Sequence, residues 1–449
     1  MSEVQLSIKT VKFGGSSLAS AEQFRKVKAI IEADKTRRYV VPSAPGKRFS
    51  EDIKITDMLY TCQRLAAAGE DFSEQIGLIR ERYLGIAKEL SLSVDLTGEL
   101  EEIAARLKEG ATKDYAASRG EYLNGKLLAE YLGFPFVDAA DVICFNDNGM
   151  LMMSETMTAL RNRLEGLDNA VIPGFYGSRQ NGEVITFSRG GSDITGSLVA
   201  RAVRAEIYEN WTDVSGVLVA DPRIVKNAAV INTITYEELR ELSYMGATVL
   251  HEDAIFPVRA AGIPINIRNT NRPEDPGTLI VADDSADSDA TTGYTITGIA
   301  GKKGFCAINI NKAMMNSEIG FCRKVLTVLE ELNISIEHMP TGIDTMTIIV
   351  SEESIKDREK TVISRIRKAV SPDNCTIEHG ISLLAVVGRG MRRTRGTAAR
   401  IFASLAHARI NVKMIDQGSS ELNIIIGLLE GDFEEAIRRI YAMFVDSKL

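Results

Sequence analysis

The chain of 449 residues has few of the residues that mark metal centres or disulfide frameworks. Its five cysteines are scattered without any C-x-x-C spacing, and its four histidines lie far apart. An odd number of isolated cysteines argues against disulfides and zinc knuckles, and the histidines form no ligand motif. We therefore expect buried, reduced thiols and no resident metal site.

Long apolar runs and an excess of positive charge are also missing. The longest hydrophobic stretches are strand-sized, and the N-terminus has neither a cationic segment nor a hydrophobic one. This pattern predicts no membrane span and no signal peptide, and hence a cytoplasmic protein. The formal net charge of −8 disfavours nucleic acid and anionic membranes as partners. The composition, 45% hydrophobic and 25% charged, is that of an ordinary globular protein. The chain is long enough for about three domains.

Strand-like and helix-like segments alternate over residues 1–282. The expected strands include the run through Val11 and the later segments 39–43, 134–138, 170–175, 206–210 and 264–268. Such alternation predicts an α/β domain with a mostly parallel sheet between helices. Residues 283–293 are acidic and small and have no apolar periodicity, which indicates a linker.

The segment after the linker contains an internal repeat. Gly396 lies 76 residues after Gly320, and apolar positions match at the same offset, for example Ile334 with Ile410. The first copy is expected to read strand, helix, strand, strand, helix, strand, with its first helix near 319–331. One supersecondary unit has therefore been used twice.

The second copy is one strand short of this pattern. The first copy occupies residues 304–380, and its third element is expected to be a strand at 334–338. The second copy starts near 381 and ends in a helix close to the last residue. Residues 294–303 offer a spare strand just before the first copy. We therefore expect 294–303 and 381–449 to form one domain, with the first copy inserted in it.

The first motif with a chemical meaning is residues 12–17, Lys-Phe-Gly-Gly-Ser-Ser, where a strand runs into a helix. Gly14 and Gly15 let backbone N–H groups approach an anion closely, and Lys12 adds a point charge beside them. Ser16 or Ser17 can cap the following helix. The motif thus suits a phosphate, although Gly-Gly-Ser-Ser after a strand also occurs as an ordinary turn.

A second glycine-rich segment, residues 187–196, again joins a strand to a helix. Arg189 can hold a carboxylate through two hydrogen bonds, and the helix N-terminus favours an anion. Two such sites suggest two anions, a small amino acid and a nucleotide, and hence phosphoryl transfer. The alternative is that Ser192 and Asp193 only cap the helix while Arg189 pairs on the surface.

A third polar segment, residues 211–223, follows the expected strand 206–210. The carboxyl end of a strand is where α/β sheets bind ligands. Asp213 can accept from a ribose hydroxyl and Arg223 can reach a phosphate, or else the segment is a polar turn. Glu121 lies on an expected helix, 113–131, where a glutamate is ordinarily solvated.

Together these segments resemble the aspartate kinases, members of the amino acid kinase family that carry a pair of ACT domains. The resemblance covers nearly the whole chain and rests on residues 12–17, 189–193, 211–216, 221–223 and 246–251. It implies an amino acid kinase fold, a mostly parallel sheet between helices, over residues 1–282. It also implies that the doubled unit is two βαββαβ ACT domains, 304–380 inserted in the domain of 294–303 and 381–449.

The resemblance also implies roles for single residues. Lys12 and Asp193 would be catalytic, with Lys12 stabilising the transferred phosphoryl group. The residues implied for aspartate binding are Ser43, Thr56, Glu121, Arg189 and Ser192. The residues implied for the nucleotide are Lys12, Gly14, Gly15, Ser16, Thr212, Asp213 and Arg223. Arg189 would hold the α-carboxylate and Glu121 the ammonium group, while Mg²⁺ would bridge the ATP phosphates.

Two positions depart from the family pattern. Leu218 stands where a tyrosine is usual, and Thr248 stands where a lysine is usual. Both positions usually face the nucleotide, so these departures concern ATP affinity. The polar stretch between Lys47 and Thr56 is also longer than usual.

An amino-acid effector, lysine or threonine or both, is expected in the first repeat copy. The residues proposed for it are Met315, Ser317, Gly320, Phe321 and Glu337. Residues 317–321 are expected to open a helix whose N–H groups receive a carboxylate, and Glu337 to end the next strand and pair with an ammonium group. Lys413 occupies the matching place in the second copy, so the copies should bind differently. Alternatively, Glu337 is simply exposed at a sheet edge.

The expected function is therefore a feedback-regulated aspartate kinase that makes 4-phospho-L-aspartate from ATP and L-aspartate. It would lie in the biosynthesis of lysine and threonine and form a homodimer or homotetramer through its ACT domains. Two alternatives stay open at this point. One is another amino acid kinase, such as glutamate 5-kinase, and the other is a non-catalytic amino-acid sensor whose kinase half only supports the ACT pair.

Overall fold

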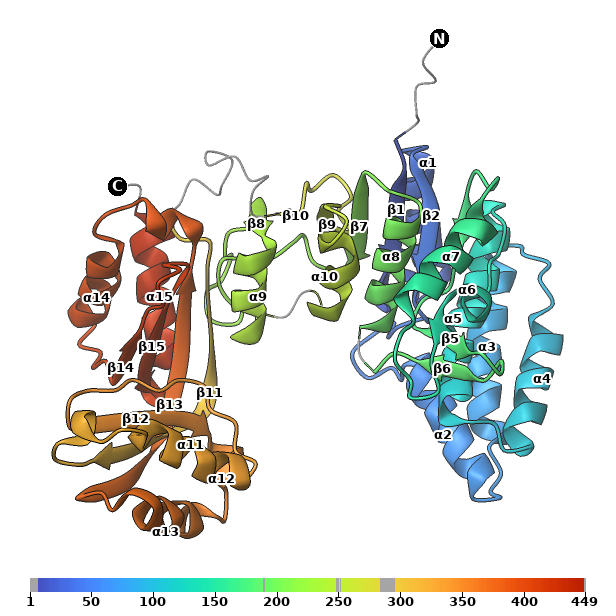
Figure 1. Cartoon of the computed structure of the whole chain (residues 1–449). Coiled ribbons are helices and arrows are strands. Elements are labelled where there is room, and N and C mark those ends of the chain that lie inside the picture. The colour runs from blue at the N-terminus through green and yellow to red at the C-terminus, as the bar shows by residue number, and fades with distance from the viewer. Residues whose placement is uncertain (1–6, 189, 248–249, 251, 283–294, 448–449) are drawn as a thin grey trace. The chain divides into compact units, whose positions relative to one another are not determined.

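A computed structural model of the chain describes residues 7–188, 190–247, 250, 252–282 and 295–447. Contacts divide the chain into two compact units (Figure 1). The first comprises Met1–Val217, Asn232–Tyr236 and Val249–Ala290, and the second comprises Leu218–Ile231, Glu237–Thr248 and Thr291–Leu449. The second unit thus contains two stretches that the sequence analysis counts in the first domain, and the expected domain limits remain predictions.

A seven-stranded sheet forms the centre of the first unit, in the order β4-β2-β1-β7-β9-β10-β8. Its strands are β1 (Lys9–Phe13), β2 (Arg37–Pro42), β4 (Ala170–Val171), β7 (Ile207–Thr212), β8 (Thr233–Thr235), β9 (Ile265–Asn269) and β10 (Thr278–Val281). All neighbouring strands are parallel except β9 and β10. The carboxyl ends of β1, β2, β7 and β9 therefore meet at one edge, the usual ligand edge of an α/β sheet.

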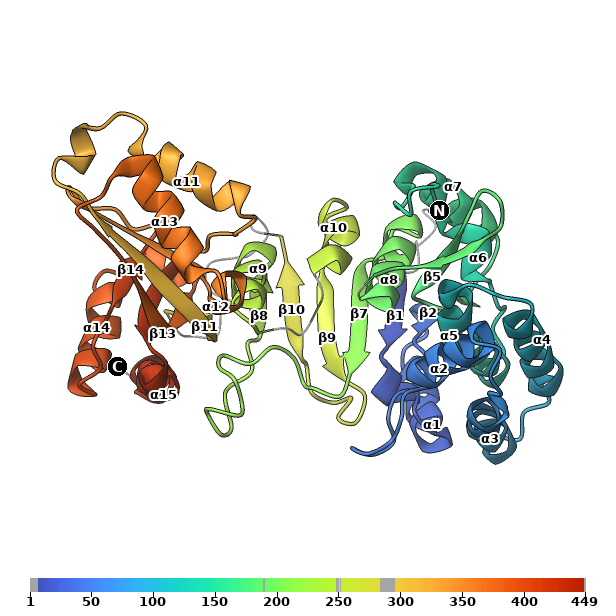
Figure 2. The ribbon, with the colours of Figure 1, turned by 90° about the horizontal axis from the view of Figure 1, so that it is seen from below.

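Helices cover both faces of this sheet. The helices of this unit are α1 (Ala21–Glu32), α2 (Ile55–Ala67), α3 (Ser73–Glu89), α4 (Leu96–Lys108), α5 (Lys113–Leu132), α6 (Ala139–Val142), α7 (Met153–Leu164), α8 (Gly191–Ala202) and α10 (Glu252–Arg259). Figure 2 shows α1 on one face and α8 with α10 on the other. Apolar residues of α1, α3, α4 and α5 form one core with Val11, Phe13 and Trp211. A small sheet of β3 (Cys144–Phe145), β5 (Tyr176–Arg179) and β6 (Val184–Thr186) adjoins them.

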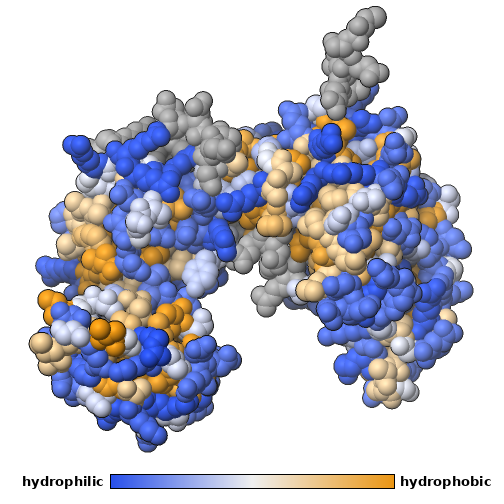
Figure 3. All heavy atoms as spheres, viewed as in Figure 1, coloured by the Kyte–Doolittle hydropathy of each residue, from blue (hydrophilic) through white to orange (hydrophobic). Residues whose placement is uncertain are grey.

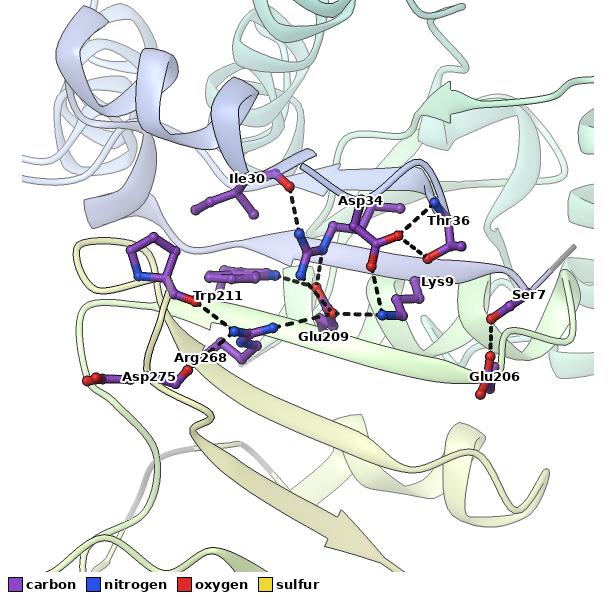
Figure 4. A network of polar contacts seen from close by, with 12 residues as sticks. Ser7, Lys9, Ile30, Asp34, Thr36, Glu206, Glu209, Trp211, Arg268 and Asp275 are labelled. Carbon is purple, nitrogen blue, oxygen red and sulfur yellow. Dashed lines mark hydrogen bonds and ion pairs between the residues drawn. The ribbon is translucent and has the colours of Figure 1, made fainter. Parts of the chain in front are cut away.

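A buried charged network joins four strands of the large sheet (Figure 4). Glu209 on β7 is 2% exposed and accepts hydrogen bonds from Arg37 Nε on β2 and from Trp211 Nε1, both at 2.8 Å. Lys9 Nζ on β1 and Arg268 Nη1 on β9 lie 3.8 and 3.9 Å from its other oxygen. Removing one member of a buried ion network leaves an uncompensated charge and is strongly destabilising. The network therefore links these four strands through Glu209.

The second unit is built on a five-stranded antiparallel sheet in the order β12-β11-β13-β15-β14. Its strands are β11 (Gly298–Asn311), β12 (Thr345–Ser351), β13 (Asn374–Val387), β14 (Met414–Asp416) and β15 (Asn423–Leu429). Residues 305–311 of β11 pair with β12, while residues 298–302 pair with 383–387 of β13. The segment before the first copy thus completes the second copy, as predicted. The two copies share one continuous sheet because both use the long strands β11 and β13.

The helices of the second unit are α9 (Tyr236–Tyr244), α11 (Phe321–Glu331), α12 (Glu352–Ile355), α13 (Glu359–Val370), α14 (Thr397–His407) and α15 (Phe433–Tyr441). Helix α11 packs beside α13, and α14 packs beside α15 (Figures 1 and 2). Hydrophilic residues cover most of the visible face of each unit (Figure 3). Among the described residues, no helix has the length and apolarity needed to cross a bilayer.

Several predicted elements were wrong in detail. The predicted strand 134–138 forms only a single bridge, Phe136 with Val171, because Pro135 has no N–H to donate to a ladder. The predicted strand 334–338 likewise reduces to a bridge between His338 and Ile349. The helix expected near residue 319 begins at Phe321, after Gly320 with a φ of 82°. The predicted linker, 283–293, lies outside the described residues.

Candidate active site

A buried lysine–aspartate pair lies at the ligand edge of the large sheet. Lys12 on β1 is directly opposite Asn210 on β7, and its Nζ is 2.6 Å from Asp193 Oδ1 on α8. Asn210 Nδ2 donates to the same oxygen at 2.8 Å, and Asn210 Oδ1 accepts from Lys12 at 3.3 Å. The side chains of Lys12 and Asp193 are 10% and 17% exposed. The carboxylate of Asp193 therefore orients Lys12 rather than capping α8, whose N-cap is Gly190.

Two glycine loops meet beside this pair. Gly14 N–H donates to Trp211 O at 2.9 Å, and Gly46 N–H donates to Gly15 O at 2.8 Å. A Cβ built on Gly46 would lie 2.6 Å from the Gly15 carbonyl carbon, so only glycine fits this approach. Ser16 is half-buried in the 3₁₀ turn Gly15–Leu18. Residues 14–16 and 43–46 thus form one double loop.

The expected helix cap was wrong. Helix α1 is capped by Ser20, whose hydroxyl accepts from Gln23 N–H at 3.4 Å. The hydroxyl of Ser17 lies 2.7 Å from that of Thr270, which follows β9. Ser17 therefore joins the turn after β1 to the segment after β9.

Glu121 is buried inside α5 rather than solvated, being 5% exposed. Its carboxylate accepts from the backbone N–H of Ala44, while Oε2 has no hydrogen-bond partner among the described residues. Burial raises the pKa of this carboxyl to about 8, against smaller opposite effects of the Ala44 N–H and of Arg119. Arg119 is itself buried, with its guanidinium 4.4 Å from the centre of the Tyr122 ring. A ligand cation at Oε2 would restore the charged form.

The other predicted acceptor residues lie around Glu121 and the double loop. Ser43 is half-buried, and its carbonyl accepts from Asn124 Nδ2 at 2.6 Å. Ser192, in the first turn of α8, is so close to Gly174 that a Cβ there would lie 2.6 Å from the serine Cβ. Thr56 is half-buried in the first turn of α2, whose neighbouring residue Ile55 packs against Gly120. Arg189 lies outside the described residues.

The nucleotide residues are only partly brought together. Thr212 ends β7, its carbonyl accepts from Thr270 N–H at 2.8 Å, and its hydroxyl donates to the exposed Asp213 at 3.2 Å. Arg223 belongs to the second unit, where its guanidinium pairs with Asp221 at 2.6 Å and is 88% exposed. Leu218 bridges to Val230 in the same unit, and Thr248 lies outside the described residues.

Comparison with known proteins agrees with this geometry. The amino acid kinase family model matches residues 8–269, and an ACT domain model matches residues 384–444. Aspartokinase 3 of Bacillus subtilis is 41% identical over 453 residues, which cover 97% of this chain and 98% of that protein. The chain belongs to the aspartokinases of the amino acid kinase family.

Two solved aspartokinase structures share its fold. The crystal structure of Clostridium acetobutylicum aspartate kinase, described as an allosteric enzyme, is 50% identical, with a TM-score of 0.90 over 98% of this chain and 100% of that one. That of E. coli aspartokinase III in complex with aspartate and ADP is 24% identical, with a TM-score of 0.72 over 97% and 99%. The predicted fold class and family are therefore confirmed.

In this aspartokinase four of the five predicted effector residues, Met315, Ser317, Gly320 and Phe321, lie just before or at the start of α11. Met315 and Phe321 are buried, whereas Ser317 is exposed and ends a short 3₁₀ turn. The expectation that residues 317–321 open a helix was wrong, because the left-handed Gly320 separates the turn from α11. Glu337 ends no strand but lies half-buried and accepts a hydrogen bond from the Tyr244 hydroxyl at 2.5 Å.

Three residues that contact the candidate site escaped the sequence analysis. Asn210 holds both Lys12 and Asp193, but an asparagine inside a strand carries no sequence signal of its role. Asn124 lies one helical turn after Glu121, so it shares that face of α5, and this spacing was a usable signal. Arg82, on α3, binds the 43–46 loop and resembles any helical arginine in the sequence.

Proposed function

We propose that the chain is an aspartate kinase that transfers the γ-phosphoryl group of ATP to the β-carboxylate of L-aspartate. A carboxylate oxygen attacks the γ-phosphorus, the bond to the bridging oxygen of ADP breaks, and 4-phospho-L-aspartate and ADP leave. The observation that carries this proposal is the buried Lys12 ammonium, oriented by Asp193 beside the double glycine loop. Phosphoryl transfer depends mainly on positioning and on neutralising charge, which a fixed cation and backbone N–H groups supply.

The acceptor is proposed to bind next to Glu121. Its ammonium group would pair with Oε2 of Glu121, which has no protein partner in the described residues, and its α-carboxylate with Arg189. Ser43, Thr56 and Ser192 would line the remaining pocket. This orientation leaves the β-carboxylate of aspartate for the phosphoryl group near Lys12.

The nucleotide is proposed to bind where β1 and β7 end. Gly14, Gly15 and Ser16 would contact the phosphates, while Thr212 and Asp213 would contact the ribose side. Arg223 is retained as a nucleotide contact from the sequence resemblance alone. Mg²⁺ would accompany ATP and offset phosphate charge; the carboxylates of Asp193 and Asp213 are the hard oxygen donors that suit this ion.

Regulation is proposed to act through the first ACT copy. Lysine, threonine or both would bind near Met315, Ser317, Gly320 and Phe321, with the effector ammonium group on Glu337. The Tyr244 hydroxyl, which donates to one oxygen of that carboxylate, would compete with the effector ammonium group. A homodimer or homotetramer formed through the ACT domains and a cytoplasmic location complete the proposal.

The activity is tested by incubating the full chain with ATP, Mg²⁺, L-aspartate and hydroxylamine. Acyl phosphates react with hydroxylamine to give a hydroxamate, which is coloured by ferric ions. We expect hydroxamate only when aspartate, ATP and Mg²⁺ are all present. Hydroxamate from L-glutamate instead would favour the glutamate kinase alternative, and no product from either amino acid would favour the non-catalytic sensor.

A further inference from the structure

Helix α3 lies outside the proposed catalytic residues, yet two consecutive residues of it reach the acceptor side. Arg82 binds the loop that follows Ser43, and Tyr83 binds the turn of α5 that carries Glu121. Both side chains are buried, at 6% and 0% exposure. A single rigid helix thus contacts the two segments that would hold aspartate.

Arg82 is tied to the loop by two kinds of acceptor. Its Nη2 donates to the carbonyl oxygen of Gly46, and its Nη1 donates to Asp52 Oδ2 at 2.7 Å. Arg48 Nε and its backbone N–H each donate to the same Asp52 oxygen at 2.9 Å. The hydrogen bonds from Arg48, together with Arg82, hold the pKa of Asp52 well below its ordinary range. The Asp52 carboxylate therefore joins both arginines to the 46–52 loop.

The loop that Arg82 holds is the one that touches the phosphate cradle. Gly46 N–H donates to Gly15 O, and Ala44 N–H donates to Glu121. A Cβ on Gly120 would lie 2.9 Å from Ala44 Cβ, so α5 and the loop are also in close contact. Tyr83 OH donates to the carbonyl oxygen of Gly120 at 2.7 Å, which anchors the other side of this contact.

We propose that Arg82 and Tyr83 are positioning residues that set the spacing between the 43–46 loop and Glu121, and thereby place aspartate for attack. The inference rests on the proposed aspartate kinase activity. A substitution far from the reacting atoms that shifts the substrate by about 1 Å can lower the rate about 100-fold. We call the hydrogen bonds from Arg82 to Gly46 and Asp52 the Arg82 clamp. Its loss should therefore impair the use of aspartate without removing any group that touches substrate.

The first experiment compares Arg82→Met with Arg80→Met. Arg80 lies on the same helix, is 41% exposed and is 3.7 Å from Glu101, so it is a matched control. We expect kcat/KM for aspartate to fall by about 10- to 100-fold in Arg82→Met, with a smaller change in KM for ATP. Arg80→Met should match the wild type. Equal kinetics of both variants, or a loss confined to ATP, would overturn the proposal.

A second measurement separates positioning from folding. Arg82 borders a cavity of about 360 Å³ together with Arg48 and Asp52, which leaves room for a small cation. We expect guanidinium chloride at millimolar concentration to restore part of the aspartate turnover of Arg82→Ala but not of Lys12→Ala. Tyr83→Phe, which removes the hydrogen bond to the Gly120 carbonyl, should lower kcat/KM for aspartate less than the substitutions of Arg82 do. Failure of guanidinium to rescue a folded Arg82→Ala variant would count against the clamp.

Hydrogen exchange without substrates tests the clamp independently of the activity. Exchange of the backbone in residues 43–53 should be faster in Arg82→Met than in the wild type, whereas α4 should be unchanged. If the wild type makes no aspartyl hydroxamate but the exchange result holds, the proposed function fails and the clamp stands. Unchanged exchange in residues 43–53 would refute the clamp even in an active enzyme.

Discussion

Glu121 in the first unit and Glu337 in the second are both proposed to hold the ammonium group of an amino acid, but their surroundings differ. Glu121 lies inside a helix, is 5% exposed, and has one carboxylate oxygen without a partner in the described structure. Glu337 lies in an irregular segment, half-buried, with the Tyr244 hydroxyl already bound. Glu121 therefore offers a preformed site for an ammonium group. At Glu337 an ammonium group would compete with the Tyr244 hydroxyl.

This difference suits the proposed roles of the two glutamates, substrate binding for Glu121 and effector binding for Glu337. A buried carboxylate without a partner gains much from a bound cation, because burying an uncompensated charge is costly. A carboxylate that must give up a hydrogen bond gains less and binds more weakly. The Glu337 hydrogen bond also raises the pKa of Tyr244 to about 12, so the hydroxyl stays protonated as the donor. Catalysis and regulation should thus respond to separate substitutions.

The largest expected effect is that of Lys12→Ala. Removing a preorganised charge from the transition state should lower kcat by about 100- to 1,000-fold or more. Effector binding, measured by calorimetry, should be unchanged because Lys12 belongs to the first unit. Lys26→Ala in the first unit removes an exposed ion pair with Glu22 and is the control, which should keep its turnover. A folded Lys12→Ala variant with kcat near that of the wild type would refute the catalytic assignment.

Arg189→Lys should have the next largest effect. Lysine keeps the charge but lacks the planar fork that matches a carboxylate. The loss of one charge-assisted hydrogen bond, about 1.5 kcal/mol, should raise the aspartate KM about tenfold and leave the ATP KM nearly unchanged. Steady-state kinetics with each substrate varied in turn measures this split. Equal increases in both constants would move Arg189 to the nucleotide side.

Substitutions at the second glutamate should change inhibition without changing turnover. Glu337→Ala should raise the inhibitory concentration of lysine, alone or with threonine, about tenfold, since coupling free energies are typically about 1–3 kcal/mol. Tyr244→Phe should lower it about two- to tenfold, because the effector no longer competes with a hydrogen bond of about 0.5–1.5 kcal/mol. Lys413→Ala, at the matching place of the second copy, is the control. Unchanged inhibition in Glu337→Ala would place the effector elsewhere.

The last expected effect is on stability rather than on activity, and it depends on pH. The pKa of Glu121 is about 8 in the folded chain and about 4.3 in an unfolded one, so the folded state loses stability as pH rises between these values. Glu121→Gln cannot ionise, and its Tm should gain on that of the wild type from pH 5 to pH 8. Glu130, on the same helix, has a pKa lowered from 4.5 by hydrogen bonds from Ser93, so Glu130→Gln should show no gain from pH 5 to pH 8 and serves as the control. A constant Tm difference in Glu121→Gln would contradict the raised pKa.

The sequence motifs predicted which segments carry the site but not how each side chain is held. Lys12 and Asp193 came from separate glycine-rich segments, and their ion pair depends on the neighbouring positions of β1 and α8. The helix around Glu121 was predicted nearly to its ends, yet its burial was not, because α5 is covered by α2 and α3. Arg82 had no distinguishing neighbours in the sequence. Its role arises only when α3 lies against the 43–46 loop.

The sequence by itself determined the alternating α/β half, the order of the glycine motifs, and the doubled unit with its missing strand, because local periodicity and repeats are written in consecutive residues. Only the tertiary structure decided that both repeat copies share β11 and β13, that Asn210 joins Lys12 to Asp193, and that Arg82 on α3 binds the 43–46 loop. These features arise from strand register and helix packing between segments far apart in the chain. Such pairings depend on the whole core and leave no pattern in any single segment.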